Sequence, residues 1–260
     1  MLELIFSLNP WVLASALNTI LLALAFLAPK KLLTPAGLLH AWALGVILWG
    51  TLGWQGYVVV MFYFLVGSGV TRLGIAEKEA AGIAEKRSGV RGPENVWGSA
   101  LTGTICALSV YIITLFFSDV KWLVPFFLLG YVASFSTKLS DTCASEVGKV
   151  YGKQTFLITT LQPVPKGTEG AVSLEGTLAG VVASFALALV GWSVGMINFT
   201  GIFFCMLAAF IATNLESIIG ATLQNKFNFL TNEIVNFINT FIGAIVAILI
   251  AFAWNSWQLL

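Results

Sequence analysis

The stretch from Ser134 to Gly180 is rich in charged side chains and lies between two apolar segments. Spanning a membrane does not require these charges. This stretch contains four carboxylates and four amines: Asp141, Glu146, Glu169, Glu175, Lys138, Lys149, Lys153 and Lys166. Carboxylate oxygens are ligands for a hard cation such as Mg²⁺, and amines neutralise phosphate oxygens. Glycines and hydroxyls stand among the charges. The combination predicts a site for phosphate and a metal ion at the ends of lipid-embedded helices.

Helical spacing places part of this stretch on one small polar face. Three- and four-residue steps, which align on a helix, connect Lys138, Asp141, Ser145 and Gly148 or Lys149. Asp141 is therefore the first expected ligand of Mg²⁺, and the other polar side chains of this face are expected to contact phosphate. Glu146 is the second expected ligand, although it lies off the face. The alternative is an ion pair between Lys138 and Asp141 that ties down a helix end.

A proline-rich turn and a helix start follow. Residues 163–170 read PVPKGTEG, and residues 173–177 read SLEGT. A phosphate fits at a helix start, because free amides and the helix dipole favour negative charge. The expected phosphate contacts are Lys153, Gly167, Thr168, Gly176 and Thr177. Catalytic roles are expected for Asp141, Lys166 and Glu175, with a simple dipole contact as the alternative for Glu175.

A second polar segment, residues 67–100, is too polar for lipid and too long for a simple turn. Its sequence IAEK at 75–78 recurs at 83–86, which predicts a cytoplasmic helix whose charges, including Lys78, are solvated. Further on, basic residues alternate with glycines before a span begins. Arginine grips phosphate in a bidentate fork, so anion binding is predicted for Arg87, Arg91 and Asn95. A basic loop attracted to acidic lipid is the alternative.

Polar residues also recur inside the last two apolar segments. Glu216 lies near the end of one of them, and an embedded carboxylate is a functional candidate because its burial is costly. We expect Glu216 to join the metal ligands. A polar stripe facing the lipid substrate is expected from Asn214, Ser217, Asn232, Asn236 and Asn239. Hydrogen bonding between helices is the alternative for the asparagines.

Composition defines the elements that must position these groups. With 58% hydrophobic and 10% charged residues and a positive mean hydropathy, the 260-residue chain is not a water-soluble globular domain. It is predicted to be an all-α, polytopic membrane helix bundle with about eight spans of roughly 20 residues each, seven or nine remaining open. The expected spans lie near Trp11–Ala28, Ala36–Gly50, Gln55–Val70, Gly98–Phe117, Trp122–Thr137, Leu174–Met196, Gly201–Gly220 and Glu233–Trp254.

Charge placement orients the predicted bundle. Residues 1–260 are expected to form one transmembrane domain with cytoplasmic loops at about 71–97 and 138–173. With both termini on the outside, twelve of the thirteen Lys and Arg residues lie on the cytoplasmic side, and Lys121 alone lies opposite. The net charge of +1 gives no indication of nucleic-acid binding. The cytoplasmic face is therefore the expected location of water-soluble anionic chemistry.

Four segments carry a resemblance that covers the chain from Leu33 onward: TRLGIAEKEAAGIAEKRSGVRGPENVWGSA, FSTKLSDTCASEVGKVYGK, PVPKGTEGAVSLEGTLAG and NLESIIGATLQ. They resemble the integral-membrane family that includes transmembrane protein nineteen and the plastid phytyl phosphate kinase of vitamin E synthesis. The parts SDTCASEVGKVYGK and SLEGTLAG are also similar, more distantly, to dolichol and phytol kinases.

The resemblance implies transfer of a phosphate from a nucleoside triphosphate, with CTP expected, onto an isoprenoid monophosphate. The product would be a diphosphate such as phytyl diphosphate, made in the thylakoid or plasma membrane of a photosynthetic host for tocopherol and prenylquinone synthesis. Phosphoryl transfer requires positioning and charge neutralisation, which the residues above could supply with Mg²⁺. A cytidylyltransferase that forms a CDP-lipid and a lipid-phosphate transporter or flippase are the alternatives.

Overall fold

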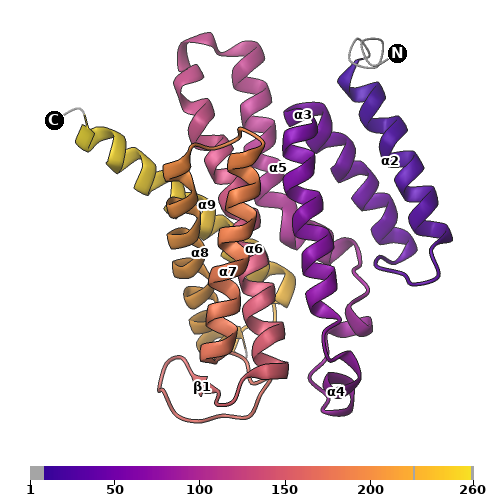
Figure 1. The fold of residues 1–260 in the computed structure, drawn as a ribbon, viewed down its shortest axis with the longest axis vertical. Helices are drawn as coiled ribbons and strands as arrows, with labels where there is room; N and C mark the ends of the chain where they lie inside the picture. The colour runs from indigo at the N-terminus through magenta and orange to yellow at the C-terminus, as the bar shows by residue number, and fades with distance from the viewer. Residues whose placement is uncertain (1–8, 225, 259–260) are drawn as a thin grey trace.

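The computed structural model describes residues 9–224 and 226–258, which form a bundle of long helices with almost no β-structure (Figure 1). The predicted all-α membrane class is confirmed. The α-helices are α2 (Pro10–Leu27), α3 (Pro35–Thr71), α4 (Ile75–Ala80), α5 (Pro93–Phe116), α6 (Val124–Tyr151), α7 (Leu174–Ser193), α8 (Phe199–Ile219) and α9 (Asn232–Gln258). Shorter helical turns are η1 (Lys86–Gly89), η2 (Ser118–Leu123) and the π-helix η3 (Gly220–Gln224).

Seven helices of the described chain are long and apolar enough to cross a bilayer, and α3 supplies two of the crossings. At Gly53 its backbone leaves the helical region, with φ 68° and ψ −163°, a conformation that glycine adopts without a Cβ penalty. Gly37 and Gly67 both lie against Arg91, although a straight helix would hold them about 45 Å apart. The two arms of α3 therefore run antiparallel, with the break inside the predicted 51–54 interval.

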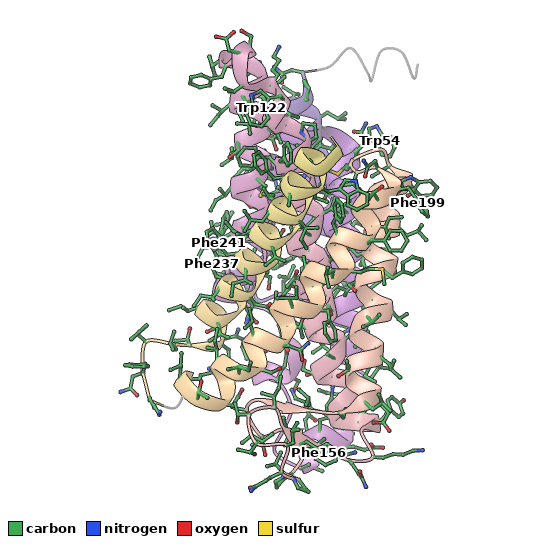
Figure 2. All side chains as sticks on the ribbon, turned by 90° about the vertical axis from the view of Figure 1, so that its left-hand side faces the viewer. Trp54, Trp122, Phe156, Phe199, Phe237 and Phe241 are labelled. Carbon is green, nitrogen blue, oxygen red and sulfur yellow. The ribbon has the colours of Figure 1, made fainter. Side chains whose placement is uncertain are left out.

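The bundle has one charged end and one opposite end. Helix α4 and strand β1 lie at the lower end in Figure 1, whereas α2 starts and α9 finishes at the upper end. Among the residues labelled in Figure 2, Phe156 lies at the charged end, and Trp122, the neighbour of Lys121, lies at the opposite end. Strands β1 (Phe156–Leu157) and β2 (Ala171–Val172) pair antiparallel.

Helix α6 is the central helix of the bundle. It packs against α3, α5, α7, α8 and α9, and its residues Tyr131, Phe135 and Leu139 are fully buried. The outer faces of the surrounding helices expose large apolar side chains such as Phe116, Val182 and Leu249. Apolar patches of this extent are typical of a protein that is solvated by lipid.

Helix α6 continues well beyond the predicted span. It reaches Tyr151, and with 28 residues it is about 42 Å long, more than the roughly 30 Å hydrocarbon core of a bilayer. The polar residues from Lys138 to Lys149 therefore lie on a rigid helix. The irregular part of the loop predicted at 138–173 begins only at Gly152.

Glycines allow α6 and α7 to approach closely at the charged end. Gly176 lies against the backbone of Ala144 and Gly148, and Gly180 lies against Ser140. Close backbone approach through small residues is the common way in which membrane helices pack. Gly176, expected to contact phosphate, thus serves helix packing.

We predict that Gly176→Ala lowers the free energy of unfolding by about 1–3 kcal/mol, because the added methyl group would collide with the Ala144 carbonyl. The matched control is Gly69→Ala in α3, where a Cβ meets no atom within 4 Å. There we expect no loss, and a gain of up to about 1 kcal/mol from helix propensity. Unfolding in detergent micelles measures both values, and equal stability of the two variants would contradict this packing account.

Candidate functional site

A polar cavity of about 460 Å³ opens at the charged end of the bundle, between α6, α7, α8 and α9. The loops at 82–95 and 167–173 complete its wall. Fourteen of the residues predicted for the site line it: Arg91, Asn95, Lys138, Asp141, Ser145, Lys149, Gly167, Thr168, Thr177, Asn214, Glu216, Ser217, Asn232 and Asn236. The fold thus brings together side chains from segments about 140 residues apart in the sequence.

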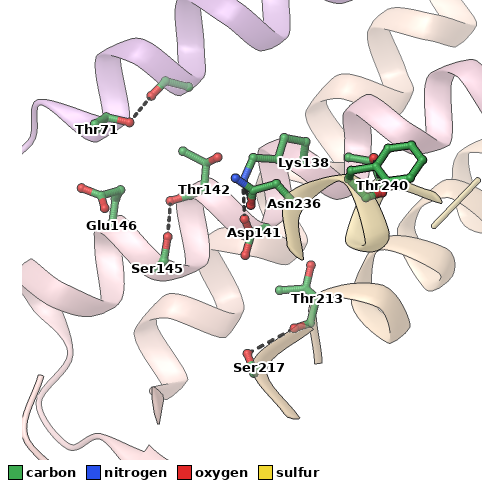
Figure 3. Close-up of polar contacts among 12 residues, drawn as sticks. Thr71, Lys138, Asp141, Thr142, Ser145, Glu146, Thr213, Ser217, Asn236 and Thr240 are labelled. Atoms are coloured by element: carbon green, nitrogen blue, oxygen red, sulfur yellow. Dashed lines mark hydrogen bonds and ion pairs between the residues drawn. The ribbon is translucent and has the colours of Figure 1, made fainter. Parts of the chain in front are cut away.

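Lys138 is the centre of the polar contacts in this cavity (Figure 3). Its Nζ donates to Asp141 Oδ2 at 2.6 Å and to Asn236 Oδ1 at 2.7 Å. The i, i+3 ion pair, which was the alternative to a metal-ligand role for Asp141, therefore exists, and it is also joined to α9. Lys138 and Asp141 are both buried, so each charge depends on these few partners for compensation.

Helix α8 adds a second carboxylate opposite α6. Glu216 lies close enough to Lys138 to be attracted by its positive charge. It is also close enough to Asp141 and Glu169 to be repelled by their negative charges. One turn earlier, the buried Thr213 Oγ1 has no hydrogen-bond partner among the described residues. The helix then passes into the π-helix η3, a geometry that occurs frequently at functional sites.

The start of α7 faces the cavity from the other side. Ser173 caps this helix by accepting a hydrogen bond from the Gly176 amide at 3.1 Å. Ser173 and Thr177 both line the cavity, and so does Lys149 of α6. The wall therefore combines hydroxyls, an amine and a helix N-terminus, all of which suit an anion.

The loop after β1 covers the cavity and is supported at two points. Gly167, at φ 83°, lies against Ile83, and Gly170, at φ 77°, lies against Ser217 and Ala221 near the end of α8. Glycine adopts such positive φ values without a Cβ penalty. The two contacts hold Thr168 and Glu169 at the cavity wall.

Glu146 lies outside the cavity in a separate ion cluster. Its side chain is fully buried, pairs with Lys78 Nζ through Oε2, and accepts from Lys149 Nζ at 2.8 Å through Oε1. Lys78 is only 2% exposed and also donates to the Thr71 carbonyl at 2.7 Å. The expectation that Lys78 is solvated was wrong, because this lysine ties α4 to α6. Both oxygens of Glu146 are occupied, so the structure does not bring it to Asp141 and Glu216.

Several other predicted residues also lie outside the cavity. Arg87 Nη2 binds Glu94 at 2.5 Å and Asn95 at 2.8 Å. Lys153 is exposed, and Lys166 donates to the Val150 carbonyl at 3.1 Å. Glu175, in the first turn of α7, and Gly176 do not line the cavity.

Asn239 is buried inside the bundle and does not line the cavity. It is 1% exposed, and neither side-chain atom has a hydrogen-bond partner among the described residues. On the next residue, Thr240 shares a hydrogen bond of 2.9 Å with Thr102 of α5. This part of the predicted asparagine stripe belongs to the packing between helices.

The cavity offers oxygen ligands from two facing carboxylates. Across the described residues, no group of three or more His, Cys, Asp or Glu side chains is arranged to hold a metal ion. Asp141 and Glu216 nevertheless fit Mg²⁺, which commonly binds one or two carboxylates and completes its shell with water and substrate phosphate.

Sequence reasoning missed Ser173, Thr213 and Lys78. Thr213 lies three residues before Glu216 on the same helical face, so the spacing used for α6 would have found it. Ser173 carries the sequence signature of a helix N-cap. The burial of Lys78 had no local signal, because its partner is 68 residues away.

Comparison with known proteins supports a membrane family. The model of the family described as integral membrane protein DUF92 matches residues 18–244. An uncharacterized membrane protein of Synechocystis is 69% identical over 239 residues, covering 92% of this chain and 90% of that protein. The protein named VTE6, chloroplastic, of Arabidopsis thaliana is 45% identical over 262 residues, covering 98% and 77%. An uncharacterized membrane protein of Methanocaldococcus jannaschii is 33% identical over 233 residues, covering 89% and 91%. No solved structure matches the chain.

We predict that Glu146→Ala lowers the free energy of unfolding by about 3–5 kcal/mol, because it leaves the buried Lys78 cation without its counter-ion. The control, Glu77→Ala, removes an exposed carboxylate from α4 and should change stability by less than about 0.5 kcal/mol. Chemical unfolding in micelles reports both. A small effect at Glu146 would mean that the cluster does not stabilise this end of the bundle.

Proposed function

The chain belongs to the DUF92 family of integral membrane proteins, and from this membership we propose that it is a lipid kinase. The reaction transfers a phosphate from a nucleoside triphosphate, with CTP as the expected donor, to an isoprenoid monophosphate. Phytyl phosphate is the expected acceptor and phytyl diphosphate the product. The similarity to the chloroplastic Arabidopsis protein and the resemblance of four long motifs to phytyl phosphate kinases support this substrate class.

The observation that carries the proposal is the polar cavity at the end of a lipid-embedded bundle. Cationic and anionic side chains from α6 and α8 converge there with the N-terminus of α7. A soluble nucleotide needs such a polar site, and a lipid phosphate reaches it from the membrane. A kinase and a cytidylyltransferase both require these two partners at one place, and their products distinguish them.

The proposed step is a direct displacement at phosphorus. An oxygen of the acceptor phosphate attacks the γ-phosphorus and forms a new P–O bond. The bond between that phosphorus and the β–γ bridging oxygen breaks, and the nucleoside diphosphate leaves with the electron pair. Because the acceptor oxygen is already anionic, the protein need not supply a strong general base.

The side chains of the cavity account for the charge neutralisation that this step requires. Of the lysines predicted for the site, Lys138 and Lys149 line the cavity and would contact phosphate, whereas Lys153 and Lys166 do not line it. Lys138 is oriented by Asp141 and Asn236, so its ammonium group is fixed before substrate binds. Ser173 and Thr177, at the start of α7, offer hydroxyls to phosphate oxygens.

Mg²⁺ is the expected cofactor. Asp141 and Glu216 would hold it together with substrate phosphate oxygens, and Glu146 would not. When bound, the ion would offset the negative charge that accumulates on the triphosphate. Lys138, which already pairs with Asp141, would then be freed in part to contact phosphate.

We place the reaction at the cytoplasmic side of a thylakoid or plasma membrane. Twelve of thirteen basic residues were assigned to that side by the positive-inside rule, and relatives occur in a cyanobacterium and in a protein named as chloroplastic. The diphosphate product would then enter tocopherol and prenylquinone synthesis.

Purified protein supplied with phytyl phosphate, Mg²⁺ and each nucleoside triphosphate tests the proposal. We expect a nucleoside diphosphate and phytyl diphosphate as products, with the highest rate for CTP. Pyrophosphate together with a CDP-lipid would contradict the kinase and support a cytidylyltransferase. The absence of both products would leave transport as the better account.

Asp141→Asn should lower turnover by about 100-fold or more, because the cavity loses one of its two facing carboxylates. We expect the variant to fold, because asparagine still accepts a hydrogen bond from Lys138, but with a lower free energy of unfolding, because the buried lysine loses its counter-ion. Asp119→Asn is the matched control, because Asp119 is exposed in η2 at the opposite end of the bundle. Full activity of Asp141→Asn would remove this residue from the site.

A further inference from the structure

A second cavity, of about 280 Å³, lies between α2, α3 and α5 and is almost entirely apolar. Its wall includes Leu22, Leu38, Val60, Phe64 and Val96. The polar groups at its inner end satisfy one another, since Tyr57 Oη donates to Asn18 Oδ1 at 2.9 Å and Asn18 Nδ2 donates to the Ala14 carbonyl at 2.9 Å. This cavity therefore suits a hydrocarbon chain.

Arg91 and Asn95 line both the apolar cavity and the polar cavity. They form the junction between the two spaces. The Asn95 side-chain oxygen accepts from the Gly92 amide and from Arg87, whereas its Nδ2 makes no hydrogen bond with any residue that the structure describes. Both residues thus present N–H donors where the two cavities meet.

Arg91 is a buried cation that lacks a counter-ion. It is 9% exposed, and within the described chain no carboxylate approaches it closely enough for an ion pair. Its Nη1 donates to Tyr63 Oη at 3.0 Å, and its guanidinium lies 5.5 Å from the Tyr63 ring centroid and 5.9 Å from that of Phe64. Burying an uncompensated charge is costly, so an external anion would be bound favourably here.

The backbone of Arg91 is fixed in place. Its amide donates to the Leu32 carbonyl, and its carbonyl accepts from the Thr34 amide, both at 3.0 Å. The side chain is therefore held between the two cavities before any ligand arrives. A guanidinium in a fixed position can grip two oxygens of a phosphate at once.

We propose that the apolar cavity between α2, α3 and α5 binds the isoprenoid chain of the lipid phosphate, with its phosphate on Arg91 at the mouth of the polar cavity. The identity of the lipid in this inference rests on the proposed kinase function. The proposal assigns the isoprenoid chain to α2, α3 and α5, which make up the first four spans, and the reaction to the later helices. The length of the apolar cavity then limits which chains are accepted.

Photolabelling locates the chain without requiring catalysis. A phytyl phosphate analogue with a diazirine near the end of its chain is irradiated with the full-length protein in micelles, without nucleotide, and labelled peptides are mapped by mass spectrometry. We expect labels on α2, α3 or α5 that excess phytyl phosphate suppresses. Labels confined to the outer faces of α7, α8 and α9, or equal suppression by phosphatidic acid, would overturn the proposal.

Arg91→Gln tests the phosphate contact. In the unaltered protein, phytyl phosphate should suppress labelling at lower concentration than phytol does, because only the former carries the anion. We expect Arg91→Gln to abolish this difference, and Arg87→Gln, whose side chain is ion-paired outside both cavities, to retain it. Loss of the difference in both variants, or in neither, would overturn the role of Arg91.

Ala25→Phe tests the cavity itself, because it adds a ring to the wall. Ala23→Phe, at an exposed position of the same helix outside the wall, is the control. We expect Ala25→Phe to raise the KM for phytyl phosphate about tenfold, with little effect on geranyl phosphate. Equal effects of both variants on both lipids would overturn the assignment.

The two proposals fail separately. Labels in the apolar cavity without phosphoryl transfer would overturn the kinase and support the cavity as the binding site of the chain. Phosphoryl transfer with labels elsewhere would overturn the cavity assignment and leave the kinase intact.

Discussion

The ion pair between Lys138 and Asp141 is the interaction on which the polar end of this bundle depends. It lies on the central helix, where both side chains are buried, and its charges are compensated by one another and by Asn236 of α9. A low-dielectric interior makes such contacts stronger and their loss more costly. The pair therefore links helix packing to the site, because the same bonds that join α6 to α9 also orient the lysine in the cavity.

Two carboxylates on α6 have different functions because of their angular position. Asp141 and Glu146 are five residues apart and therefore differ by about 140° around the helix axis. Asp141 faces α8 and the cavity, while Glu146 faces α4 and binds Lys78. Helix geometry thus divides one acidic segment into a site for ligands and an anchor for the neighbouring loop.

The sequence predicted what depends on local patterns. The length of the apolar segments predicted the spans, and helical spacing predicted the face that carries Lys138, Asp141 and Ser145. The sequence did not predict which residues pair with the long, flexible lysine and arginine side chains. These partners come from segments that meet only in the folded bundle. Lys78 and Arg87 both have acidic partners, whereas Arg91 has none in the part of the chain that the structure describes. Three basic residues with similar surroundings in the sequence thus have three different environments.

The bend at Gly53 determines on which side of the membrane both ends of the chain lie. By dividing α3 into two arms it makes the number of crossings even, so α2 starts and α9 finishes at the end away from the polar cavity (Figure 1). An affinity tag or fluorescent reporter fused at either terminus would consequently occupy the compartment opposite the polar cavity. Attachment to a soluble protein on the side of the cavity would instead require insertion into a loop.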